Sequence, residues 1–200
     1  MKKSILFTLL TLIVFNVFGT EYKFSEIKCW KYNKYLETLE PTTIEIKYET
    51  DMPNGILLKY DLTYYMLPME YIKDFRSVCE KYYEWEKIAI DNKAEITKEM
   101  PITINTMAMW THSFDEDRLG MGYGNFKFTF FSQSSTLHQL IISTSDIKDE
   151  LSYNIYPHTL ENLYFNKSDV DFLYKEISEE NIEKQLEIVK HKQDVESLFN

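Results

Sequence analysis

The hydrophobic pattern of the chain begins with a run that has no counterpart later in the sequence. Ile5–Phe18 contains no ionisable residue and follows two lysines. A membrane-spanning helix needs about 20 apolar residues, so this run is short for an anchor. A basic start, an apolar run and then small residues are typical of a secretory signal peptide. With Val17 and Gly19 at the −3 and −1 positions, the sequence predicts cleavage between Gly19 and Thr20, and an uncleaved N-terminal anchor is the alternative.

Alternating apolar and polar residues predict a hairpin after Pro41. Ile44, Ile46 and Tyr48 alternate with charged residues, and the turn-forming stretch DMPNG follows. The alternation then resumes in residues 56–64, which are predicted to form the second strand. Residues 22–40, before this hairpin, fit either a short helix or the beginning of a strand.

A helical period follows Pro68. Apolar residues at positions 72, 75, 79, 82 and 89 lie on one face and predict one long amphipathic helix across the sheet. Near the C-terminus, Ser168 and Ser178 are predicted to cap two further helices.

Four more segments alternate as strands do: 101–112, 125–133, 136–145 and 151–157. The glycine-rich stretch LGMGYGN at 119–125 is predicted to be a hairpin connection. The expected fold is α+β: a mainly antiparallel sheet of about five or six strands, one long helix after the first hairpin, and a helical C-terminus packed on the sheet. Residues 1–19 are the predicted signal and 20–200 a single domain, with one sheet face open to a partner.

Composition supports an ordered core, since 44% of residues are hydrophobic, 16% are aromatic, and glycine and proline number five each. The formal net charge is −10. Residues 1–19 hold two of the 22 basic residues and none of the 32 acidic ones, so their removal changes this charge to −12. Such a chain is unsuited to nucleic acid and to broad attachment to anionic lipid.

The two cysteines, Cys29 and Cys79, have two interpretations. An even number of cysteines in an exported chain suggests a disulfide. Alternatively, Cys79 is a core residue, because it lies on the apolar face of the long helix.

The stretch THSFDEDRLGMGYGN is the first candidate for site chemistry. It offers His112, Asp115, Glu116 and Asp117, but it lacks the carboxylate spacing of a calcium loop and the several His or Cys ligands of a zinc site. A solvated hairpin tip is the simpler interpretation. No metal or cofactor is predicted.

His138, which follows SQSST, is the second candidate. A hydrolase would need a nucleophile, a base and an orienting acid to meet in space, and no G-x-S-x-G or S-x-x-K motif is present. His158 and His191 are predicted to be surface residues.

These observations favour an exported, non-enzymatic binding protein of a bacterial periplasm, envelope or medium, with an unknown protein or small-molecule partner, no nucleic acid, and no membrane span after cleavage. One alternative is a secreted hydrolase assembled in the fold from His112, His138 and the Asp115–Asp117 loop. A structural envelope component is the second alternative.

We expect the exported protein to begin at Thr20. Gly19→Arg should block cleavage, because signal peptidase requires a small residue at this position, whereas Thr20→Ser should not. Intact-mass spectrometry of the exported protein measures this, and a wild-type mass that still includes residues 1–19 would refute the predicted cleavage.

Overall fold

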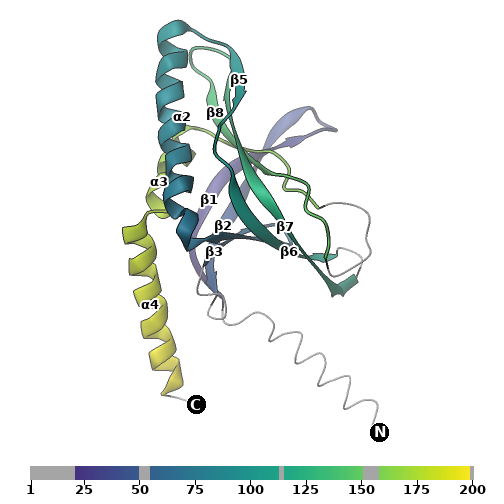
Figure 1. The fold of residues 1–200 in the computed structure, drawn as a ribbon, viewed down its shortest axis with the longest axis vertical. Coiled ribbons are helices and arrows are strands. Elements are labelled where there is room, and N and C mark those ends of the chain that lie inside the picture. The colour runs from purple at the N-terminus through teal and green to yellow at the C-terminus, as the bar shows by residue number, and fades with distance from the viewer. Residues whose placement is uncertain (1–20, 50–54, 113–114, 151–157, 199–200) are drawn as a thin grey trace.

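A computed structural model describes residues 21–49, 55–112, 115–150 and 158–198, and an antiparallel sheet forms its centre (Figure 1). The strands are β1 (Glu21–Asn33), β2 (Thr38–Glu49), β3 (Gly55–Tyr60), β4 (Thr63–Pro68), β5 (Ile96–Glu99), β6 (Ile104–His112), β7 (Asp115–Ser132), β8 (His138–Thr144) and β9 (Leu163–Phe165). The helices of the described residues are the short 3-10 helix η1 (Met69–Tyr71), α2 (Ile72–Asn92), α3 (Lys167–Glu176) and α4 (Glu179–Ser197).

The sheet closes on itself. Its strand order is β5-β7-β6-β4-β3-β2-β1-β9-β8, and β8 also pairs with β7, so that eight strands form a ring with β5 added at the edge of β7. All pairings in the described sheet are antiparallel. One face of the sheet therefore points into the ring and the other points out, and alternate residues along each strand share a face.

The predicted α+β fold with a sheet of five or six strands is wrong, because the sheet has nine strands and a ring of hydrogen bonds. One reason lies in residues 56–64, which the alternation predicted as one strand. Asp61, with φ 54°, and Leu62 form a two-residue turn that separates β3 from β4, and Tyr60 pairs with Thr63 across it. No glycine marks this turn, so the alternating pattern continues through it.

Other strands were missed for similar reasons. The ambiguous residues 22–40 belong to β1 and β2, and the glycine-rich segment 119–125 is part of β7 rather than a connection. The strand predicted at 151–157 lies outside the described residues. The helix predicted after Pro68 is confirmed as α2.

The two C-terminal helices are also present. The Ser178 hydroxyl accepts a hydrogen bond from the Asn181 N–H (3.2 Å) at the start of α4, as predicted. Helix α3 begins slightly earlier than predicted, because Asn166 rather than Ser168 is its N-cap.

The core forms where α2 lies against the inner face of β7. The Phe75 ring meets the rings of Phe126 and Phe128 edge-on, at centroid distances of 6.3 and 5.5 Å. Tyr82, about two helical turns further along α2, packs on Phe130 at 5.8 Å. These fully buried aromatic rings give the helix a fixed position on the sheet.

The same face of β7 carries glycines where it extends past the helix. Gly120, Gly122 and Gly124 alternate in phase with the three phenylalanines. A Cβ on Gly120 would lie 2.3 Å from the Trp110 ring, and one on Gly122 would lie 2.0 Å from the Lys148 carbonyl oxygen. Bare backbone is therefore needed here so that the indole and residues 145–150 can lie directly on the strand.

Both cysteines are buried as free thiols, and no disulfide joins them in the structure. Cys29 lies on β1 and Cys79 on α2. Burial raises the pKa of each thiol to about 12. The thiols are thus protonated core groups in this fold, and the disulfide suggested by the cysteine count is not formed.

Gly122→Ala should lower the free energy of unfolding by about 1–3 kcal/mol, because the new methyl group overlaps the Lys148 carbonyl and the crossing segment must move. Lys127→Ala, an exposed substitution on the same strand, serves as the control and should change stability by less than about 0.5 kcal/mol. Urea unfolding followed by circular dichroism measures both. Equal stability of the two variants would mean that the glycine is not required for close approach.

Candidate functional site

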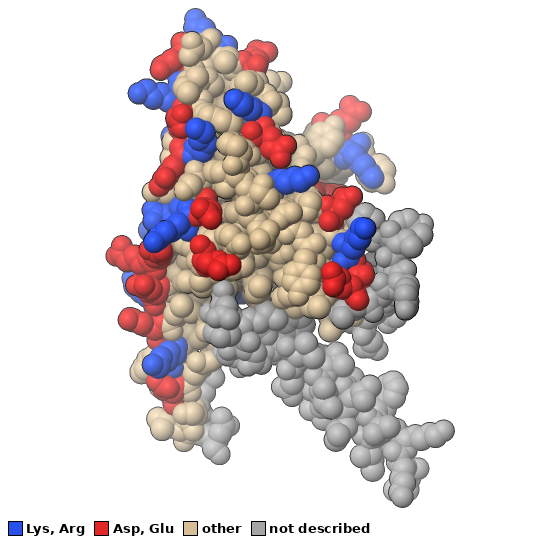
Figure 2. Space-filling view, in the orientation of Figure 1, with Lys and Arg blue, Asp and Glu red and all other residues tan. Residues whose placement is uncertain are grey.

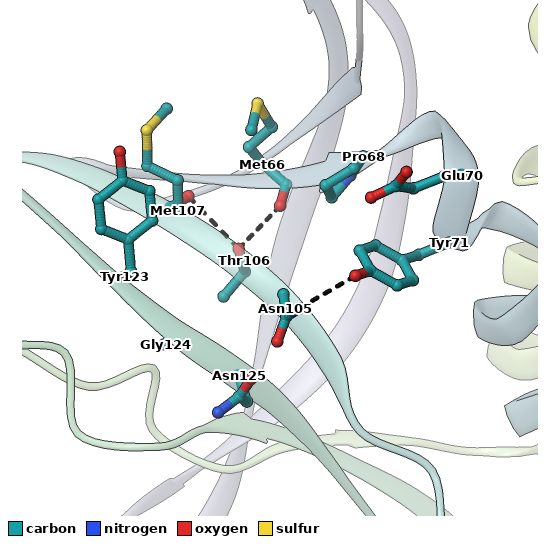
Figure 3. A pocket seen from close by; sticks show the side chains of 10 residues that line it. All are labelled: Met66, Pro68, Glu70, Tyr71, Asn105, Thr106, Met107, Tyr123, Gly124 and Asn125. Atoms are coloured by element: carbon teal, nitrogen blue, oxygen red, sulfur yellow. Dashed lines mark hydrogen bonds between the residues drawn. The ribbon is translucent and has the colours of Figure 1, made fainter.

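A groove of about 470 Å³ with a mixed apolar and polar lining lies on β4, η1, β6 and β7 (Figure 3). Its lining residues are Met66, Pro68, Glu70, Tyr71, Asn105, Thr106, Met107, Tyr123, Gly124 and Asn125. We call it the β6 groove, because β6 runs through its centre. In the same orientation as Figure 1, uncharged residues dominate the middle of the face over β6 and β7 (Figure 2).

Strand register places the apolar part of the groove. Met66 on β4 pairs with Met107 on β6, which pairs with Tyr123 on β7. Paired residues of antiparallel strands point to the same face, so these three side chains form a row on the outside of the ring. The two methionines are half-buried, whereas Tyr123 is 60% exposed. The row is therefore an apolar surface with an accessible aromatic ring.

Amide groups lie beside this row. Asn105 and Asn125 are paired across β6 and β7. The Asn105 amide nitrogen donates to the phenol oxygen of Tyr71 (3.0 Å), which holds the tyrosine at the edge of the groove. The Asn125 side chain makes no hydrogen bond within the described structure, so its donors and acceptor are available to a ligand.

The groove offers contacts rather than reactive groups. Among its lining residues, Glu70 is the one carboxylate, and the other titratable side chains are the phenols of Tyr71 and Tyr123. The lining contains no histidine, cysteine, lysine or arginine. Over the described residues, no three or more His, Cys, Asp and Glu side chains gather in a way that could hold a metal ion. Packing and hydrogen bonding are thus what this surface can provide.

Comparisons with protein-family models, curated proteins and solved structures found no match to this chain. Within the described residues, no helix has both the length and the apolar character needed to cross a membrane.

The predicted site residues lie at opposite ends of β7. His112 ends β6 and pairs with Asp115, the first residue of β7, whereas His138 begins β8 and pairs with Ser132, the last residue of β7. A straight strand of this length spans about 55 Å at roughly 3.3 Å per residue. The side chains of His112, Asp115, Glu116 and Asp117 lie outside the described residues. The backbone register alone does not bring His138 together with the acidic loop.

His138 has a buried environment with a defined proton arrangement. The Ser132 hydroxyl donates to the Ala94 carbonyl oxygen (2.7 Å) and lies 3.1 Å from His138 Nδ1. With the serine proton directed to this carbonyl, the network assigns the proton of His138 to Nδ1, which donates to the serine oxygen; a general base requires the reverse. His138 Nε2 is buried without a hydrogen-bond partner, and Ser132 is 2% exposed. The pair fixes the start of β8 and does not form an accessible nucleophile.

His158 is the histidine whose position the sequence did not reveal. Its ring stacks on Trp110 at 4.4 Å, and Nε2 lies 3.1 Å from the Thr63 hydroxyl and 3.2 Å from the Tyr65 phenol. Burial raises the pKa of Tyr65, so its phenol stays protonated. Two backbone hydrogen bonds to Ile147 (2.8 Å each) hold His158 in place.

This packed arrangement of His158 differs from the surface position that was predicted. No local signal marks it, because the residues around His158 come from distant strands. His191, by contrast, is exposed as predicted.

Ser132→Ala should destabilise the fold by about 1–3 kcal/mol, because it leaves the Ala94 carbonyl and the His138 Nδ1–H without a partner in the interior. Ser135→Ala, in the exposed turn three residues later, is the matched control and should change stability by less than about 0.5 kcal/mol. Urea unfolding compares the two variants. A Ser132→Ala protein as stable as the control would show that the hydroxyl has no structural role.

Proposed function

We propose that this protein is an exported, non-enzymatic binding protein whose ligand site is the β6 groove. The observation that carries the proposal is the combination, on one outward face, of an apolar row (Met66, Met107, Tyr123) and the Asn125 amide, which makes no hydrogen bond with the described residues. Ligand sites are usually concave and apolar with a few placed polar groups.

The lining residues favour one chemical class of ligand. Methionine side chains are flexible and polarisable, so Met66 and Met107 can adapt to an irregular apolar group. The exposed Tyr123 ring can stack on a flat surface, while the amides of Asn105 and Asn125 can bind polar groups. Glu70 disfavours an anion. The ligand is therefore a neutral or cationic amphipathic molecule, or a segment of a partner protein with the same character.

The predicted export of the chain also supports this function. The signal predicted in residues 1–19 would direct the chain to the periplasm or medium, and the net charge of −12 that remains after cleavage suits an aqueous compartment. The hydrolase alternative receives no support from the groove, because its lining lacks a nucleophile and base in contact.

Methyl-labelled methionine NMR tests the binding role. Octyl glucoside, octylammonium and octanoate, each below its critical micelle concentration, represent neutral, cationic and anionic amphipaths. We expect the first two to shift the Met66 and Met107 methyl signals, while the signal of Met100, which is buried in the core, stays fixed.

Asn125→Ala should weaken this binding by about 10-fold, since one hydrogen bond to the ligand is lost. Gln133→Ala, which removes an exposed amide outside the groove, should leave the affinity unchanged. Binding of none of the three probes, or equal affinity of Asn125→Ala and wild type, would contradict the proposed site. Ester hydrolysis that is lost in His138→Ala would instead contradict the non-enzymatic role.

A further inference from the structure

The hairpin of β1 and β2 is longer than the closed sheet requires. The two strands pair from Glu21 with Glu49 to Asn33 with Thr38. Within the described residues, however, β9 pairs with β1 only at Trp30 and Lys31, and β3 pairs with β2 only at residues 45–47. Residues 32–39, which we call the hairpin tip, therefore pair only with each other. They form the end of the purple hairpin that projects from the body, away from the helices (Figure 1).

The hairpin tip exposes large apolar side chains. Tyr35 is 85% exposed and Leu36 65%, and both lie in the turn. Behind them, Tyr32 (49%) and Leu39 (38%) face each other across the strands and so point to the same face. Adjacent apolar groups on a projecting element are characteristic of a surface that contacts another body.

Hydrogen bonds hold the turn that presents these side chains. The Asn33 side-chain oxygen accepts from the backbone N–H groups of Tyr35 (2.9 Å) and Leu36 (3.1 Å). The Asn33 amide nitrogen donates to Glu40 across the hairpin (2.8 Å). The turn is thus preformed, and binding through it loses little conformational entropy.

The shape and charge of the hairpin tip fit a lipid bilayer. A convex end can enter a fluid interface, whereas a protein partner would have to supply a matching pocket. Tyrosine and leucine beside lysine are typical of the boundary between headgroups and acyl chains, where lysine stems extend their charge towards water. The Lys34 ammonium already lies 5.3 Å from the centre of the Tyr35 ring.

The charge of the hairpin tip also favours a bilayer as the surface that it binds. The hairpin tip holds one lysine, Lys34, and one glutamate, Glu37, whereas the whole chain has a net charge of −10. The hairpin tip is therefore a neutral end on an acidic protein, and apolar contact rather than charge attraction must drive its binding.

We propose that the hairpin tip attaches the protein to a bilayer surface, with Tyr35 and Leu36 inserted at the level where headgroups meet acyl chains. Tyr32 and Leu39 lie among the headgroups in this arrangement. Attachment at this site is independent of the ligand of the β6 groove, because the groove lies on β4, η1, β6 and β7.

Co-sedimentation of the exported full chain with phosphatidylcholine vesicles tests the proposal. We expect wild-type protein to bind, Tyr35→Ser/Leu36→Ser to reduce the partition coefficient by about 10-fold or more, and high salt to have little effect. Leu62→Ser/Ile90→Ser, which removes two other exposed apolar residues (48% and 46%) away from the hairpin tip, should bind within about 2-fold of wild type. Tyr35→Trp should give a shift of fluorescence to shorter wavelength when vesicles are added.

Three results would overturn the proposal. Wild-type protein that does not sediment with vesicles refutes attachment, and equal binding of the Tyr35→Ser/Leu36→Ser variant refutes the assigned residues. Binding that needs phosphatidylglycerol and disappears in high salt refutes apolar insertion. Since all of the substituted side chains are exposed, circular dichroism should show that each variant keeps its fold.

Discussion

The steric fit between bare backbone on β7 and the groups that lie on it is the constraint on which the closed sheet depends. Between Gly120 and Phe130, the inner face of β7 carries three glycines and then three phenylalanines, which fill the space below α2. Trp110 and residues 145–150 occupy the space that side chains would take at Gly120, Gly122 and Gly124. At this contact, residues 145–150 are held against the sheet by hydrogen bonds such as Ser145 N–H to the Asn125 carbonyl (2.8 Å).

The β6 groove follows from the same strand. Because β7 directs its even-numbered residues inward, Tyr123 and Asn125 must point out, next to Met107 and Asn105 on β6. The segment held over the glycines supports this arrangement from the inside, since the Ser145 hydroxyl accepts a hydrogen bond from the Asn125 N–H (2.9 Å). The outer face of this part of the sheet is therefore as well fixed as the core behind it.

Local pattern was sufficient to predict the inward residues but not the order of the strands. Alternation predicted the strand at 125–133, in which Phe126, Phe128 and Phe130 share the inward face, and the apolar face of α2 was predicted from its helical period. The ring could not be predicted, since closure depends on the pairing of β8 with β7 and on β9, a strand of three residues. The glycines were misassigned for a related reason: in isolation they indicate a turn, and only the segment that crosses them explains their place in a strand.

For the same reason, the candidate site could not be predicted from the sequence. Alternation along the strand places Asn105 and Met107 on the face opposite to that of Ile104 and Trp110, so the sequence alone was sufficient to predict that they point outward. The residues that complete the groove beside them lie on β4 and β7. These strands lie on either side of β6 only because of the strand order of the sheet. His158 shows the effect most clearly, because its contacts with Trp110 and Tyr65 join three distant parts of the chain.

The projecting hairpin is longer than closure of the ring requires. The sheet closes through Trp30 and Lys31 on one side and through residues 45–47 on the other, so the residues beyond them add nothing to closure. Tyr35 and Leu36 also contribute almost no burial to folding, since most of each side chain faces solvent. Apolar side chains that neither close the sheet nor fill the core lower solubility without adding stability. Their presence on a preformed turn is therefore explained by contact with something outside the chain, and a bilayer fits both the convex shape and the neutral charge of this end.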